Sequence, residues 1–320
     1  MASHLTFATR ITALLASTSL AILLGIASAN AQTPAAPAAT PPSPGAAELE
    51  ARMDAAVKHL MREPRLKNVP EKQVRDRFEF VAGNVIFATM HEVGHMLIAE
   101  MALYVLGREE DAADSFAVVA GLKLNDSLSD EILMQSARGW FMSDLRNKKQ
   151  KIKNVFYDEH GLDEQRAYNI VCIMVGSNPE KYSKLADITR MPEERQGTCQ
   201  GDYSNASWSW DKALAPYMRK DDQPRTPASV TYGDSKKYEN IERAMREMKI
   251  LEAVAGFLSS RFVFSRGPVG LEAKECNTPG AFWDLKTRKI YVCYELAVDF
   301  IDMYRGYSAA LRKEARKSKR

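Results

Sequence analysis

The chain has 320 residues, of which 45% are hydrophobic and 27% charged, and its formal net charge is +3. A chain of this length and composition can bury a sizeable core of its own. Without Arg10 the net charge is +2. Residues 312–320 alone carry a net charge of +5, from six basic side chains and one acidic. The body is therefore about −3 by subtraction, which argues against a nucleic-acid-binding domain.

The N-terminal segment has the composition of a targeting sequence. Residues 1–31 hold a single charged side chain, then an apolar stretch over 11–26, then a small-residue ending, Ala29-Asn-Ala31. This order predicts a secretory signal peptide that is cleaved after Ala31 or after Ala29. An uncleaved anchor is the alternative, although the apolar stretch is marginal for crossing a bilayer. Residues 32–47 are rich in Ala and Pro and are expected to form a disordered tether.

Helical patterns dominate the rest of the chain. The pattern of residues 48–63 predicts an amphipathic helix, and the segment from Pro64 to Pro70 ends it. Apolar spacing and start or stop residues predict further helices over about 84–106, 107–119, 129–147, 164–175 and 238–264. Residues 197–210 are rich in aromatic and polar side chains and are expected to form an irregular loop.

Two segments near the C-terminus predict strands. In 269–276 and 288–294, β-branched and aromatic residues alternate with polar ones, and a Pro-Gly pair lies between the segments. We therefore expect a hairpin. The second strand is a candidate edge for binding an extended peptide by strand addition, and a purely structural hairpin is the alternative.

The chain has four cysteines, an even number. In an exported protein this favours disulfides, and four cysteines allow three pairings. None has C-x-x-C spacing, which argues against a cysteine zinc site or a thioredoxin-like motif. Proximity in the sequence favours Cys172 with Cys199 and Cys276 with Cys293.

The segment His91-Glu92-Val93-Gly94-His95 is an H-E-x-x-H motif inside an apolar helical pattern. On a helix, positions i and i+4 project from the same face, so both imidazoles can reach one metal ion. Glu92 lies on the flank of that face, where it can act as a general base. Gly94 would let another backbone approach closely. The alternative is a buried helix with two hydrogen-bonded core histidines.

A catalytic zinc ion needs a third protein ligand and one open position. Glu110 follows His95 in an acidic helix start and is assigned as that ligand, with Glu109 as the fallback. Asp114, at i+4 from Glu110, is expected to accept the second N–H of one metal-bound histidine. The competing interpretation of these acids is a solvated helix start that complements the helix dipole.

H-E-x-x-H followed by E-x-x-A-D resembles the gluzincin metallopeptidases. The longer runs H-E-V-G-H and G-R-E-E-D-A-A-D are similar to the family DUF4344, as are residues 158–169, 170–179, 279–284 and 293–295. The resemblance implies an α+β fold, a mostly helical zincin-like domain with a small β-sheet or hairpin beside the active-site helix. Residues 48–311 would form this metallopeptidase-like domain, and 312–320 a basic tail.

In such a site Glu92 would take a proton from the attacking water and return it to the leaving amine. The oxyanion would be stabilised by the metal and a second donor. His160 is the preferred donor, because it lies in a dense polar stretch, and Tyr157 and Tyr168 are the other candidates. A local structural hydrogen bond is the competing role for His160.

The sequence thus predicts an exported, periplasmic or secreted zinc metallopeptidase, with one zinc ion and a peptide or protein substrate. One alternative is a catalytically weak zinc-binding scaffold or binding protein of the cell envelope. Another is a zinc amidase that cuts a non-protein envelope amide. The basic tail could touch anionic lipid or an envelope polymer, with a frayed, solvated terminus as the simpler interpretation.

Overall fold

The computed structural model describes residues 44–220 and 222–317. The predicted signal peptide, 1–31, and residues 32–43 of the predicted tether lie outside the described residues. The remaining tether residues, 44–47, form the first turn of helix α1 (Pro44–Leu60), so the prediction of a disordered segment is wrong there. Within the described part, no helix is both long enough and apolar enough to cross a membrane.

Most of the described chain is helical, in agreement with the predicted α+β class. The helices are α1 (Pro44–Leu60), η1 (Pro64–Leu66), α2 (Glu71–Met101), α3 (Glu109–Leu124), α4 (Ser127–Gln150), α5 (Asp163–Ser177), α6 (Pro179–Ile188), α7 (Glu193–Gln196), α8 (Cys199–Leu214), η2 (Ala215–Tyr217), α9 (Glu239–Glu247), α10 (Ile250–Arg261) and α11 (Tyr294–Lys317). The strands are β1 (Ser229–Tyr232), β2 (Gly270–Lys274), β3 (Ala281–Asp284) and β4 (Lys289–Cys293).

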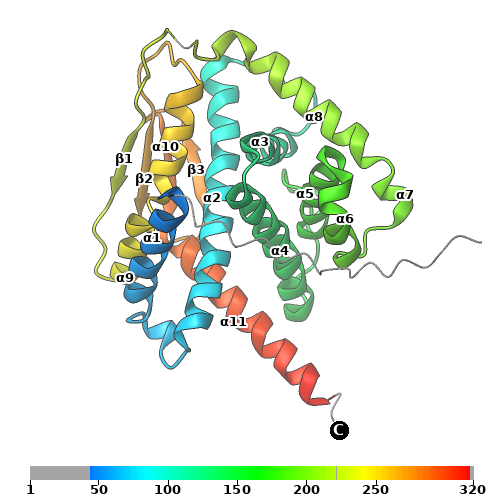
Figure 1. The fold of residues 1–320 in the computed structure, drawn as a ribbon, viewed down its shortest axis with the longest axis vertical. Helices are drawn as coiled ribbons and strands as arrows, with labels where there is room; N and C mark the ends of the chain where they lie inside the picture. The colour runs from blue at the N-terminus through cyan, green and yellow to red at the C-terminus, as the bar shows by residue number, and fades with distance from the viewer. Residues whose placement is uncertain (1–43, 221, 318–320) are drawn as a thin grey trace, which may run out of the picture. The chain divides into compact units, whose positions relative to one another are not determined.

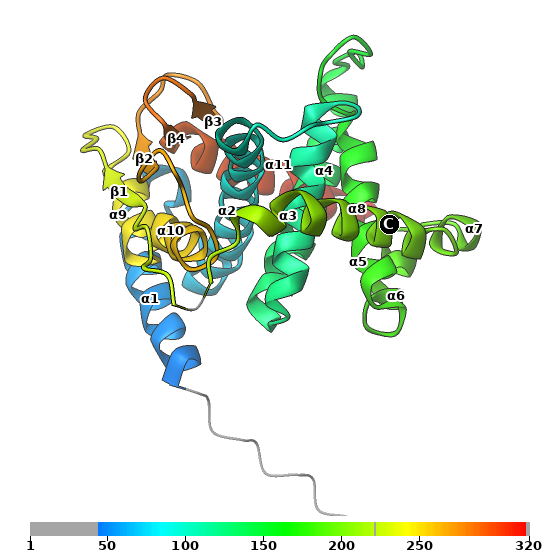
Figure 2. The ribbon, with the colours of Figure 1, turned by 90° about the horizontal axis from the view of Figure 1, so that it is seen from above.

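Helix α2 carries the H-E-x-x-H motif and runs between the sheet with α1 and α10 on one side and α3, α4 and α5 on the other (Figures 1 and 2). A hydrophobic core lies on each side. One core packs α2 against α1, α9, α10, α11 and the sheet, and the other packs it against α3, α4 and α5. The helix begins at Glu71, after Pro70, and not near Asn84 as expected. It ends at Met101, because Ala102 adopts a left-handed conformation with φ 49°. A helix covered on both sides needs no single apolar stripe.

The four strands form one mixed sheet in the order β1-β2-β4-β3 (Figure 2). Strands β1, β2 and β4 are parallel, and β3 pairs antiparallel with β4. The predicted hairpin of 269–276 with 288–294 is therefore wrong, because these two strands are parallel neighbours. The chain after the Pro-Gly pair first forms β3, a four-residue strand too short for the sequence pattern to reveal. Strand β4 lies inside the sheet, paired on both sides, so the prediction that this second strand offers an edge for an extended peptide is wrong. The edge strand beside α2 is β3.

Two further predictions also need correction. The segment 197–210 is not an irregular loop, because from Cys199 onward it belongs to a regular helix, α8, which packs against α5 where Gly176 faces the backbone of Cys199. Apolar side chains are sparse in α8, which hid the helix in the sequence. Residues 238–264 form two helices, α9 and α10, because Lys249 adopts a left-handed conformation with φ 54° and ends the first.

Both disulfides join the cysteines that are closest in sequence. Cys172–Cys199 links α5 to the start of α8, and Cys276–Cys293 links the segment after β2 to the end of β4. The carboxylate of Glu295, at the start of α11, accepts the backbone N–H groups of Cys276 and Asn277. The second disulfide and Glu295 together hold the connection from β2 to β3.

Candidate metal centre

The two histidines of the motif lie one turn apart on α2 and present their Nε2 atoms to the same space. The Nε2 atoms of His91 and His95 are 3.1 Å apart. His91 is buried and His95 is half-buried, so the pair lies at the inner end of an open site. This arrangement follows from the i, i+4 spacing on one helical face.

Helix α3 supplies the carboxylate that faces both rings. Oε2 of Glu110 lies 3.0 Å from Nε2 of His91 and 3.3 Å from Nε2 of His95. The helices α2 and α3 come this close because Gly94 has no side chain: a Cβ there would lie 2.8 Å from Cα of Ala113. The expectation that Gly94 admits a second backbone is confirmed, and the neighbour is the helix that carries Glu110.

A second carboxylate binds the other nitrogen of each ring. Oδ1 of Asp114 is 2.8 Å from Nδ1 of His91, and Oε1 of Glu109 is 2.8 Å from Nδ1 of His95. Hydrogen bonds at Nδ1 fix the tautomer that leaves the Nε2 lone pair free. Glu109, the fallback ligand, therefore lies on the outer side of the histidine pair, and Glu110 faces the inner side.

Arg166, on α5, was missed by the sequence reasoning. Its Nε and one terminal nitrogen each donate to Asp114 at 2.7 Å, and its guanidinium stacks on Trp140 at 3.8 Å from the ring centroid. Burial alone would raise the pKa of Asp114, but the hydrogen bond from His91 and the charge of Arg166 outweigh it and hold this pKa below its usual value. Asp114 thus stays an acceptor for His91. An arginine 52 positions away carries no local signal for this role.

Glu92 lies on the flank of the histidine face, against the sheet. One of its carboxylate oxygens and one ring nitrogen of each histidine lie within 4.8 Å of one another. Its Oε2 accepts the backbone N–H of Trp283, in β3, at 2.8 Å. Burial raises the pKa of Glu92 above its ordinary value, against the opposing charges of the histidines and the hydrogen bond from Trp283.

The loop between α4 and α5 brings His160 to the same place. Its Nε2 lies 2.9 Å from Oε2 of Glu110, and its Nδ1 lies 3.0 Å from Oδ1 of Asp158. The other two donor candidates are placed differently. The hydroxyl of Tyr168 donates to the carbonyl of Thr189, and the side chain of Tyr157 is 93% exposed to solvent.

The comparison with known proteins gives one match that covers most of the chain. The model of the family DUF4344, described as "putative metallopeptidase", matches residues 55–214 and 231–319. The chain belongs to the DUF4344 family. No curated protein and no solved structure matches it.

The residues that this DUF4344 chain brings together fit a bound metal ion. Ligand atoms held at about 2.0–2.1 Å from one tetrahedral zinc ion lie roughly 3.3 Å from each other. The separations among Nε2 of His91, Nε2 of His95 and Oε2 of Glu110 run from 3.0 to 3.3 Å. Two imidazoles and one carboxylate are also a donor set that suits zinc.

Proposed function

We propose that this DUF4344 protein is an exported zinc-dependent peptidase that hydrolyses peptide bonds with Glu92 as general base. The observation that carries the proposal is the convergence of His91, His95 and Glu110 on one point beside the carboxylate of Glu92. When bound there, a zinc ion would act as a Lewis acid that lowers the pKa of water and polarises a carbonyl.

Glu92 would accept the proton of the attacking water and later give it to the leaving amine. A carboxyl group with a raised pKa suits both transfers, because it gains and loses a proton more evenly near neutral pH. The Trp283 N–H holds one oxygen of Glu92 at 2.8 Å, which leaves the other oxygen to receive the proton. The burial of Glu92 and this single fixed contact support the role.

His160 would stabilise the negative charge that develops on the substrate oxygen. Its Nε2 already lies within 3 Å of Glu110, so a small rotation would bring an N–H donor to an oxygen in the same space. Asp158 accepts from Nδ1, so Nε2 can donate only when the ring is protonated; the hydrogen bond to Glu110, and also that to Asp158, raises the pKa of His160 and favours this protonated form. The hydrogen bond to Asp158 would equally fit the competing role, in which His160 only makes a local structural contact.

The edge of β3 would bind the substrate backbone. Cys293 donates its N–H to the carbonyl of Gly280, so these two form a hydrogen-bonded pair of the antiparallel ladder. Pairs alternate, and Ala281 and Trp283 therefore direct their N–H and C=O groups away from β4. The Trp283 N–H is bound to Glu92, which places this outer edge of β3 beside the base. The other outward groups of the edge are the N–H and C=O of Ala281 and the C=O of Trp283. An extended peptide could add there as a further strand.

Two loops beside the metal centre carry exposed apolar side chains. Tyr104 and Leu106 follow α2 and are 99% and 103% exposed, and Phe156 and Tyr157 precede His160 and are 82% and 93% exposed. Large apolar side chains in this position favour contact with apolar groups of a binding partner. They support a polypeptide substrate, in which such side chains are common.

The cysteines support the proposed export. Two disulfides form within the described chain and leave no free cysteine there. Disulfides persist in oxidising compartments such as the periplasm or the exterior of the cell. They support export, as the N-terminal sequence predicts.

The test is hydrolysis of casein by the purified chain and by Glu92→Gln. The amide cannot act as the base, so we expect Glu92→Gln to retain zinc and to lose activity by at least about 100-fold. Glu71→Gln, an exposed position at the start of the same helix, is the matched control and should behave as wild type. Unchanged hydrolysis by Glu92→Gln would overturn the proposal. Activity on cell-wall fragments with none on casein would favour an envelope amidase.

A further inference from the structure

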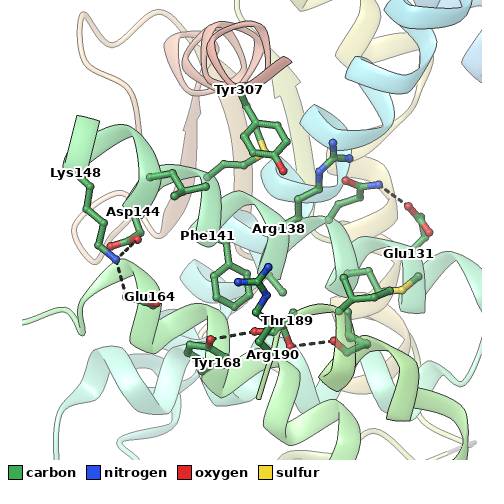
Figure 3. A pocket seen from close by; sticks show the side chains of 17 residues that line it. Glu131, Arg138, Phe141, Asp144, Lys148, Glu164, Tyr168, Thr189, Arg190 and Tyr307 are labelled. Atoms are coloured by element: carbon green, nitrogen blue, oxygen red, sulfur yellow. Dashed lines mark hydrogen bonds and ion pairs between the residues drawn. The ribbon is translucent and has the colours of Figure 1, made fainter. Parts of the chain in front are cut away.

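A second hollow lies apart from the metal ligands, between α4, α5, α11 and the turn after α6 (Figure 3). Its volume is about 740 Å³, within the range of small-molecule sites. None of the candidate metal ligands lines it. The hollow therefore needs an explanation separate from the proposed peptidase chemistry.

The walls of this hollow are largely apolar. Phe141 and Met142 of α4 and Leu185 of α6 contribute to them. Two further apolar lining residues face solvent, since Leu145 is 51% and Ile188 is 79% exposed. Exposed apolar side chains next to a hollow of this size favour a bound apolar group.

Most charged side chains of the hollow have partners. Lys148 forms ion pairs with Asp144 at 2.7 Å and Glu164 at 2.9 Å, and Glu131 accepts a hydrogen bond from Gln135 (Figure 3). These contacts satisfy the three carboxylates of the wall. Negative charge in the hollow is therefore already balanced or hydrogen-bonded.

Two arginines differ from this pattern. Within the described chain, neither Arg138 nor Arg190 has an acceptor for its guanidinium group, and in Figure 3 both side chains project among the lining residues without a dashed contact. The guanidinium of Arg138 lies over the ring of Tyr304, 4.9 Å from its centroid, with Phe80 and Tyr307 also within about 6 Å. Cation–π contacts of this kind do not supply a hydrogen-bond acceptor in the plane of the guanidinium, where its N–H donors lie. These donors remain free for an anion.

The chain's own terminal segments do not supply that anion. Residues 32–47 contain no charged side chain, and residues 312–320 carry a charge of +5 that the arginines would repel. An occupant that matches both the arginines and the apolar wall joins an anionic group to an apolar body.

We propose that this pocket binds an anionic amphiphile, a carboxylate or phosphate group on an alkyl chain. Arg138 and Arg190 bind the anionic group, and the alkyl chain packs against Phe141 and the apolar wall around it. The pocket is a site of binding and takes no part in the hydrolysis proposed above.

The experiment is calorimetric titration of the purified full chain with dodecanoate and with dodecyl phosphate, both below the concentrations at which they form micelles. We expect saturable binding of at least one. Acetate lacks the alkyl chain and dodecyl maltoside lacks the charge, so both should bind at least tenfold more weakly. Arg138→Gln and Arg190→Gln should each weaken binding by about tenfold or more, because a charge-assisted hydrogen bond is lost.

Arg62→Gln is the matched control, an exposed arginine after α1 that does not line the pocket, and should leave binding unchanged. Arg138 packs on aromatic rings, so its variant is first checked for folding by circular dichroism. Arg190 is exposed, and its variant keeps the test decisive if Arg138→Gln does not fold. Absent binding by wild type, equal binding of dodecyl maltoside, unchanged binding by Arg190→Gln, or binding only to anionic lipid vesicles would overturn the proposal.

Discussion

Arg166 fixes the orientation of His91 without touching it. It holds both oxygens of Asp114, and Asp114 in turn holds Nδ1 of His91. Groups that orient a metal ligand in this way commonly change metal affinity by about 10–100-fold when altered. The conformation of the centre therefore depends on a residue from a third helix as well as on the motif.

Arg166→Lys is predicted to weaken zinc affinity by about 10–100-fold, because lysine keeps the charge but cannot donate two parallel hydrogen bonds. Competition with a zinc chelator measures the change. Arg243→Lys, in an exposed ion pair with Glu239, is the control and should keep wild-type affinity. Equal affinities for Arg166→Lys and wild type would show that Asp114 needs no help from Arg166.

Gly94→Ala is predicted to lower the free energy of unfolding by about 1–3 kcal/mol and to weaken zinc binding. Its Cβ would meet Cα of Ala113 at 2.8 Å, so α2 and α3 must separate and carry Glu110 away from the histidines. Gly256→Ala, in α10, is the matched control, because no atom lies within 4 Å of a Cβ at that position. Urea denaturation measures both. A stable Gly94→Ala with full zinc affinity would contradict this account of the contact between the helices.

Among the elements, β3 connects the sheet to α2. The disulfide Cys276–Cys293 and the carboxylate of Glu295 restrain the segment that leads into β3. Trp283 then reaches Glu92 from this strand. Loss of Cys276–Cys293 should therefore disturb the position of Glu92 more than loss of Cys172–Cys199 does.

The double substitution Cys276→Ala with Cys293→Ala is predicted to cost about 3 kcal/mol of stability and to reduce casein hydrolysis. The matched control is Cys172→Ala with Cys199→Ala, which opens a link of similar length between α5 and α8, away from β3. The control should lose similar stability and less activity, measured below both unfolding transitions. Equal losses of activity would contradict a special role for β3.

The sequence predicted the elements that carry a continuous local signal. The histidines and Glu92 lie within five residues, and Glu110 and Asp114 follow in the next helix, so helical spacing alone placed them. Strand β3 has only four residues, and helix α8 has few apolar side chains, so both escaped the pattern. Arg166 reaches Asp114 only through the packing of α5 against α3, which no local pattern encodes.

In the molecule as a whole, α2 lies between two hydrophobic cores and carries the metal centre, to which elements from both sides contribute. Its sheet side supplies Trp283 to Glu92, and its helical side supplies Glu110, Asp114 and Arg166. Neither side alone completes the centre. A ligand bound by both α2 and α3 also stabilises the folded chain over the unfolded one.

Metal removal should therefore lower the melting temperature. With zinc in large excess over its dissociation constant, about 100-fold, the folded state gains about 2.7 kcal/mol. Calorimetry of the chain after treatment with a chelator and after zinc is restored checks this, and the change should be reversible. An identical melting temperature with and without zinc would contradict a metal site shared by α2 and α3.

Elemental analysis of the purified chain tests whether His91, His95 and Glu110 hold one metal ion. We predict close to one zinc ion per chain for the wild type and for His59→Ala, and a large loss of zinc for His95→Ala. A wild-type protein that is free of metal, or a His95→Ala variant that keeps its full zinc content, would contradict it.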